Sequence, residues 1–167
     1  RTAVAACEAL GARGILLTKY RELVPTCLSS TICHCGFAPF RQLLPLCGAV
    51  VHHGEIGTTA AALGAGCPQL NLPMAWDQPD NAARVTKLGV GAALGPRRRT
   101  SGDMARALAR LLIPQVRERC RTAAIQTSQE SGLEIAACWV ETLVGNAHWG
   151  TPPHPCPPPH QRRAPGP

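Results

Sequence analysis

The stretch from Ala49 to Asn81 (AVVHHGEIGTTAAALGAGCPQLNLPMAWDQPDN) constrains the fold more than any other part of this sequence. A short apolar run ends at His52-His53, a tight loop follows at Gly54–Gly57, and an Ala- and Leu-rich run with helical propensity starts at Thr58-Thr59. A strand, a glycine loop and a helix in this order present backbone N–H groups and a helix N-terminus to an anion such as phosphate. The stretch therefore predicts an anion-binding loop at the end of a strand.

A second apolar run, Gln69 to Met74, leads into the polar clusters Asp77-Gln78 and Asp80-Asn81. In an open α/β sheet, the glycine loop and these polar residues would both fall at the carboxyl ends of neighbouring parallel strands, where ligands bind. We therefore expect the two segments to line one pocket.

Strands and helices are expected to alternate along most of the chain. Hydrophobic patterns and breakers predict strands at 14–20, 31–35, 49–51, 69–72 and 90–94, and helices at 2–10, 41–46, 58–64, 81–88, 101–113, 115–127 and 133–144. This order predicts an α/β, Rossmann-like, doubly wound parallel sheet over residues 1–145. Because the chain starts on a helix, the first strand of that sheet is expected to be missing. Residues 146–167 are proline-rich and are predicted to form a disordered tail.

The composition excludes several classes of protein. Hydrophobic residues make up 45% of the 167 residues and charged residues 16%, which is typical of a globular chain. The net charge of +7 would suit phosphorylated ligands, nucleic acid or an anionic membrane surface. Nucleic acid is disfavoured, because the arginines are scattered and aromatic residues make up only 4% of the chain. No apolar run approaches the ~20 residues of a membrane-spanning helix, whereas peripheral membrane contact through basic helices stays open.

Nine cysteines without a recognisable secretory signal indicate reduced thiols and a cytoplasmic protein. Cys33-His34-Cys35 looks like half of a metal site, but no second Cys/His pair follows at a suitable spacing. We therefore expect no metal site. Neither a GxGxxG sequence after the first predicted strand nor a Gly-Lys-Ser/Thr sequence is present, which disfavours a dinucleotide-dependent oxidoreductase and a P-loop nucleotidase.

With these residues in view, positions 1–144 resemble the C-terminal, nucleotide-sugar-binding half of the UDP-glycosyltransferase superfamily, whose members have the GT-B architecture. The likeness is greatest to bacterial and sterol-glucosyltransferase-like members. Residues 52–59 resemble the HHGGxGTT signature of that family, and residues 73–82 resemble its donor-sugar segment. Phe37-Ala38-Pro39 matches an upstream aromatic-x-Pro segment. Three such segments in the right order are a specific signal, and they imply that residues 1–145 form a nucleotide-sugar-binding domain.

The resemblance also assigns roles to individual residues. It implies that the donor diphosphate is held by His53, Gly54, Gly57, Thr58 and Thr59. A capping role is an equal alternative for Thr59.

The donor sugar and the base have their own predicted residues. Asp77 and Gln78 would hydrogen-bond the sugar hydroxyls, with a turn at the start of a helix as the alternative. Phe37 and the backbone of Ala38 would contact the base. His52 precedes His53 on the strand and so points to the opposite face, which favours a structural role.

The implied function is transfer of a hexose from UDP or dTDP to an acceptor hydroxyl with inversion. The nucleotide sugar is a substrate, and no cofactor is expected. In the family, the general base and the acceptor pocket lie in the N-terminal half, which this sequence lacks. No catalytic residue is therefore assigned, and this chain alone is expected to be inactive. A missing N-terminal domain or a partner subunit would supply the acceptor, a small molecule or a lipid.

Two positions depart from the expected pattern. Glu55 replaces the second glycine of the signature, where a carboxylate would either repel a diphosphate or point to solvent. This departure supports an alternative, a non-catalytic or decayed fragment that keeps only the fold. Asn71 places an amide in an apolar strand and needs a hydrogen-bond partner if it is buried.

Overall fold

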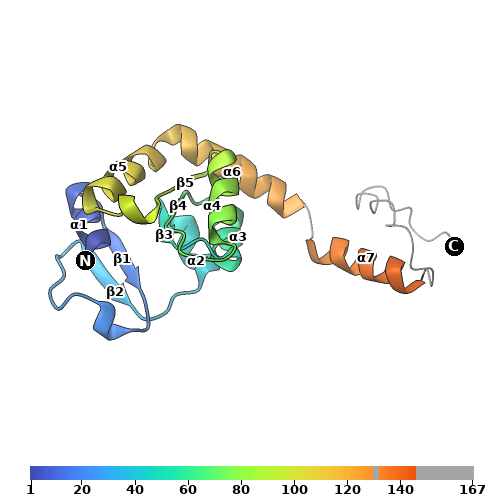
Figure 1. The fold of residues 1–167 in the computed structure, drawn as a ribbon, viewed down its shortest axis with the longest axis horizontal. Coiled ribbons are helices and arrows are strands. Elements are labelled where there is room, and N and C mark those ends of the chain that lie inside the picture. Colours follow the sequence, from blue (N-terminus) through green and yellow to red (C-terminus); the bar gives the residue numbers. More distant parts are fainter. Residues whose placement is uncertain (130–131, 146–167) are drawn as a thin grey trace. The chain divides into compact units, whose positions relative to one another are not determined.

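The computed structural model describes residues 1–129 and 132–145 and divides the chain into two compact units, Arg1–Thr127 and Ser128–Pro167. The first unit carries all the strands of the described residues (Figure 1). The second unit contains the end of the preceding helix, which stops at Gln129, and helix α7, Gly132–Gly145, which covers the helix predicted there. The predicted proline-rich tail lies outside the described residues.

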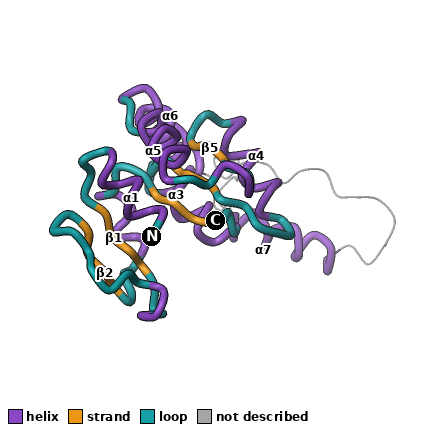
Figure 2. Tube along the Cα trace, turned by 60° about the vertical axis from the view of Figure 1, so that its left-hand side comes forward, coloured by secondary structure: helices purple, strands orange, loops and turns teal. Residues whose placement is uncertain are grey.

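Five short parallel strands form two separate sheets in the first unit (Figure 2). Strand β1 (Gly14–Leu17) pairs with β2 (Ile32–Cys35), and β4 (Gln69–Asn71) lies between β3 (Val50–His52) and β5 (Gly91–Ala93). A doubly wound sheet of order 3-2-1-4-5-6 would have one more strand between β1 and β3, which are not paired here. The predicted parallel α/β class is confirmed.

Helix α1 (Thr2–Ala9) precedes the first strand, and α-helices follow β2, β3, β4 and β5. These are α2 (Phe40–Leu43), α3 (Ile56–Gly64), α4 (Gln78–Lys87), α5 (Ser101–Leu111) and α6 (Pro114–Gln129), with 3-10 turns at 21–23, 44–46 and 96–98. The main core surrounds Leu70 of β4 and includes Val85 of α4 and Met104 of α5, all almost fully buried. Thr100 caps α5 as its sequence indicates, because its Oγ1 accepts a hydrogen bond of 3.1 Å from the Asp103 N–H.

Some predicted boundaries near the polar loops are wrong. Helix α3 begins at Ile56 rather than at Thr58, and α4 begins at Gln78 rather than at residue 81. The earlier start of α4 places Pro79 in its first turn, where the missing N–H of proline costs no intrahelical bond. The strand predicted at 14–20 ends at Leu17. Hydrophobic periodicity does not indicate these helix and strand boundaries, because the boundaries depend on local hydrogen bonds.

The thiols of the first unit agree with the sequence-based expectation. All seven cysteines in it are free. Burial raises the pKa of Cys67 to about 12, so this thiol stays protonated at neutral pH. In the second unit the expectation of reduced thiols is wrong at Cys138, which is disulfide-bonded. Within residues 1–129 and 132–145, no helix combines the length and apolarity needed to cross a membrane.

Candidate functional site

The loop between β3 and α3 is shaped by Gly54. Its φ of +98° is a conformation that suits glycine. A Cβ at this position would lie 3.2 Å from the backbone oxygen of Gln78 and 3.4 Å from Oδ1 of Asn71. The loop therefore lies directly against the start of α4 and the end of β4. This close approach requires a residue without a side chain.

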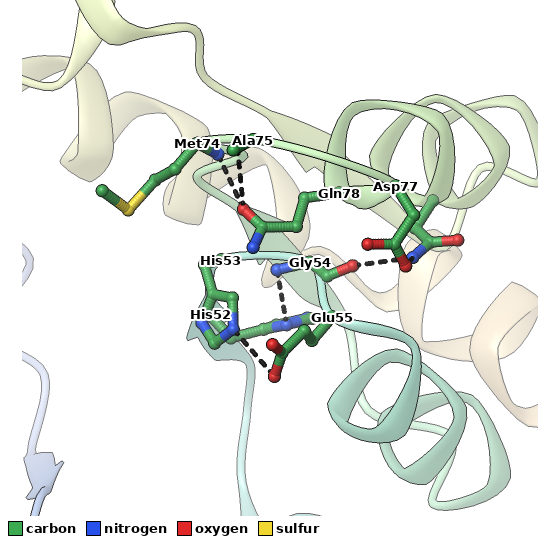
Figure 3. A network of polar contacts seen from close by, with 9 residues as sticks. His52, His53, Gly54, Glu55, Met74, Ala75, Asp77 and Gln78 are labelled. Carbon is green, nitrogen blue, oxygen red and sulfur yellow. Dashed lines mark hydrogen bonds and ion pairs between the residues drawn. The ribbon is translucent and has the colours of Figure 1, made fainter.

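Polar contacts connect this loop to α4. The Asn81 side-chain amide donates hydrogen bonds of 3.0 Å to the Gly54 carbonyl and 2.8 Å to Oδ2 of Asp77. Figure 3 shows the labelled residues of the two segments facing each other. The two polar segments predicted to share a pocket are thus brought together at the carboxyl ends of β3 and β4. Asn81 is the residue that joins them, a role that the sequence pattern alone did not single out.

The residues predicted to hold a diphosphate lie along this loop and the first turn of α3. Gly57 is exposed and Thr58 half-buried, beside helix N–H groups that have no intrahelical acceptor. Thr59 is buried and its Oγ1 has no partner within the described residues. The alternative that Thr59 caps the helix is wrong, because α3 begins at Ile56 with Glu55 at the N-cap position.

His53 and Glu55 form an ion pair across the loop, with 3.1 Å between His53 Nε2 and Glu55 Oε2 (Figure 3). Both side chains are solvent-accessible, with exposed fractions of 44% and 62%. Glu55 makes no side-chain capping bond to α3. The carboxylate is thus solvent-exposed, does not cap the helix, and contacts the imidazole that the resemblance assigns to the diphosphate.

His52 has a structural position, in keeping with the sequence analysis. Its Nδ1 accepts a hydrogen bond of 3.1 Å from the Gly54 N–H, and its Nε2 lies 3.0 Å from Oε1 of Gln69. Burial is the main cause of a lowered pKa of His52, opposed by the bond to Gln69 and assisted by the charge of His53. A neutral His52 that accepts at Nδ1 and donates at Nε2 satisfies both contacts and fixes the loop.

The two residues predicted to bind a sugar differ in their surroundings. Gln78 is buried, and its Oε1 accepts hydrogen bonds from the N–H groups of Met74 (2.8 Å) and Ala75 (3.3 Å) (Figure 3). This oxygen holds the β4–α4 loop closed. Asp77 is exposed at the N-cap of α4, without a capping bond, and so presents a carboxylate to the surface. Of the two, Asp77 has the more accessible acceptors.

Trp76 precedes Asp77 and was missed by the sequence reasoning. It is the non-glycine residue with positive φ (53°) among those described, and its side chain is 89% exposed. A bulky residue in this conformation is strained, and such strain occurs preferentially at functional sites. The only signal in the sequence was an aromatic residue next to a polar cluster.

The segment predicted to contact a base lies between β2 and α2. Phe37 is 82% exposed, Ala38 is half-buried, and the Phe37 carbonyl accepts a 2.9 Å hydrogen bond from Cys35 Sγ. In the described part of the chain, no hydrogen bond joins this segment to the β3–α3 loop or to the start of α4. Phe40, the first residue of α2, packs on the small hydrophobic cluster around Leu44.

A separate open cavity of about 730 Å³ contains none of the predicted site residues. Its lining includes Cys47, Pro68, Leu112 and Arg117, at the amino ends of β3 and β4. The Arg117 guanidinium is already engaged, donating a 2.7 Å hydrogen bond to the Cys47 carbonyl. The described residues also hold no cluster of three or more potential metal ligands.

Comparisons with known proteins identify the same architecture. The family described as "Erythromycin biosynthesis protein CIII-like, C-terminal domain" matches residues 15–140. The vancomycin aglycone glucosyltransferase of Amycolatopsis orientalis is 37% identical over 137 residues, which are 82% of this chain and 33% of that protein. The spinosyn rhamnosyltransferase SpnG complexed with thymidine diphosphate superposes with a TM-score of 0.75 at 25% identity, covering 86% of this chain and 39% of SpnG.

A second solved structure agrees with these findings. The glycosyltransferase VinC in complex with dTDP superposes with a TM-score of 0.70 at 26% identity, covering 76% of this chain and 33% of VinC. The chain thus spans about a third of the length of the relatives it matches. The specific likeness to sterol glucosyltransferases stays a prediction. The chain belongs to the erythromycin biosynthesis protein CIII-like C-terminal domain family, and its fold is that of the C-terminal half of a GT-B glycosyltransferase.

Proposed function

We propose that this chain binds a nucleoside diphosphate sugar, a UDP- or dTDP-hexose, as the donor half of a glycosyltransferase. The observation that carries the proposal is the Asn81 amide, which hydrogen-bonds both the Gly54 carbonyl and the Asp77 carboxylate. It holds an anion-binding helix start and an accessible sugar-binding carboxylate side by side. The two groups match the two chemically different parts of such a donor.

Different residues of the site bind the diphosphate and the sugar. The first N–H groups of α3, the Thr58 hydroxyl and the His53 imidazole are donors suited to a diphosphate. Asp77 accepts hydrogen bonds from sugar hydroxyls, and Gln78 shapes the loop that presents it. The exposed Phe37 offers an aromatic face to the base. Binding of thymidine diphosphate by SpnG supports dTDP as one of the nucleotides to test.

The proposed reaction is inverting transfer of the hexose to an acceptor hydroxyl. Donors at the diphosphate stabilise the charge that develops on the leaving group. An N-terminal domain or a partner subunit supplies the general base and the acceptor, a small molecule or a lipid. The contribution proposed for this chain is donor binding.

Calorimetric titration of the full chain with UDP, dTDP and their glucose derivatives tests the proposal. Asp77→Ala is expected to weaken binding of the sugar nucleotides more than that of UDP or dTDP, because only the former use this carboxylate. Asp80→Ala is the matched control, an exposed acid in the same helix turn that pairs with Arg84 at 2.7 Å. Equal losses for sugar nucleotide and bare nucleotide would contradict the assignment of Asp77.

The second candidate is a protein that keeps the fold but does not bind a nucleotide-sugar donor. The His53–Glu55 ion pair favours it, since a carboxylate holds the imidazole expected to meet the diphosphate. This candidate predicts that a folded wild-type chain binds none of the four nucleotides at millimolar concentration. Any saturable binding would exclude it.

A further inference from the structure

Asn71 is a buried amide without a partner. It is the last residue of β4 and is fully buried, and neither its Nδ2 nor its Oδ1 has a hydrogen-bond partner within the described residues. Gln69, two residues earlier on the same strand, is equally buried but satisfied. Its Oε1 lies 3.0 Å from His52 Nε2, and its Nε2 donates to the Thr59 carbonyl at 3.3 Å. Of the two buried amides of β4, Asn71 is therefore the one that lacks partners among the described residues.

A buried amide without hydrogen-bond partners destabilises the folded state, and no hydrogen bond among the described residues offsets this cost. Leucine has nearly the same shape as asparagine and would fill the same space with no polar atom to desolvate. Asn71 lies in the most buried strand of its sheet, where an apolar residue is the usual choice. An unsatisfied buried polar group in a folded protein calls for an explanation, and a role at a functional site is one of them.

The position of Asn71 indicates which site that is. Its side-chain oxygen lies under the β3–α3 loop, where a Cβ on Gly54 would be only 3.4 Å away. The loop bonds elsewhere, since the Gly54 N–H donates to His52 and the Gly54 carbonyl accepts from Asn81. The amide thus lies beside backbone groups with which it makes no bond.

We propose that Asn71 is a positioning residue for the phosphate loop. Its amide hydrogen-bonds the backbone of residues 53–55 only in the anion-bound form of the loop. This inference rests on the proposed function, because the anion is the donor diphosphate. Hydrogen bonds that exist only in the bound form stabilise that form and raise the affinity for the ligand. Asn71 therefore lowers the stability of the free chain and increases its affinity for the nucleotide.

Asn71→Leu in the full chain separates these two effects. We expect the melting temperature without ligand to rise by about 5 °C, because the unsatisfied amide is removed. We expect the affinity for UDP, dTDP and pyrophosphate to fall about tenfold, because the bound loop loses its amide partner. Gln69→Met is the matched control on the same strand. It should lower the melting temperature, because His52 and the Thr59 carbonyl lose their partner.

The outcomes distinguish this inference from the proposed function. A more stable Asn71→Leu chain that binds as tightly as the wild type would overturn the inference and leave donor binding intact. A folded wild-type chain that binds none of the three ligands would overturn both. NMR of the wild-type chain gives a check without any substitution: saturating dTDP should shift the Asn71 side-chain amide signals and slow their hydrogen exchange. Unchanged signals upon saturation would contradict the role of Asn71.

Discussion

Glu55→Gln should tighten the binding of nucleoside diphosphates. The substitution keeps the size of the side chain and removes the charge that pairs with His53 at 3.1 Å. Both partners are largely solvent-accessible, so releasing the imidazole is worth about 0–1 kcal/mol. Removing repulsion between the carboxylate and a phosphate at about 4 Å adds about 1 kcal/mol in a water-like environment. A total of about 1–2 kcal/mol corresponds to binding about 5 to 30 times tighter.

Calorimetric titration with dTDP and UDP at low and high salt measures this effect. The gain should shrink at high salt, where exposed charges are screened. Glu118→Gln is the matched control, since it changes the net charge equally and lies on α6 in an exposed pair with Arg121. Glu55→Gly should tighten binding to a similar extent. If Glu55→Gly does so while Glu55→Gln stays within about twofold of the wild type, the obstacle is steric and the electrostatic reasoning is refuted.

Three further predictions concern the supports of the site. Gly54→Ala should destabilise the chain by about 1–3 kcal/mol and weaken nucleotide binding, because φ is +98° and the added Cβ would meet the Gln78 oxygen at 3.2 Å. Chemical denaturation measures the loss, and Gly57→Ala, where a Cβ meets nothing within 4 Å, is the control. Gln78→Met should cost about 1–3 kcal/mol, because the Met74 and Ala75 N–H groups lose their acceptor; an unchanged melting temperature would contradict that role. Burial lowers the pKa of His52 in the folded state. The stabilisation linked to neutral His52 is therefore complete above the unfolded pKa of about 6.5, and it decreases as the pH falls toward the lower pKa of the folded state. The free energy of unfolding should be lower at pH 5 than at pH 7.5, and this difference should be smaller in His52→Gln.

The sequence predicted the topology of the site better than its contacts. Parallel strands place their carboxyl ends at one edge, so the meeting of the Gly54 loop with Asp77 followed from the order of elements. The contacts of Gln78 with the Met74 and Ala75 N–H groups did not follow, because they depend on a turn whose helix begins three residues earlier than periodicity indicates. The resemblance implied a sugar ligand at Gln78, which stays a prediction, and in the structure its Oε1 closes the β4–α4 loop.

Other features were beyond the reach of sequence patterns for different reasons. The pairing of His53 with Glu55 depends on side-chain rotamers, which residue spacing does not determine. Trp76 adopts a positive φ that its residue type disfavours, so propensity predicts the opposite of what is found. For Asn71 the sequence raised the right question, a partner for a buried amide, and the structure shows the burial without the partner.

The most direct test of the donor site is a titration of the ¹⁵N-labelled full chain with dTDP, followed by NMR. We predict saturable shifts at Gly54 and Thr58, followed on titration with dTDP-glucose by additional shifts at Asp77. Shifts confined to the residues around Cys47 and Arg117, at the opposite edge of the sheet, would contradict the assignment. No shifts in a folded chain would contradict donor binding itself.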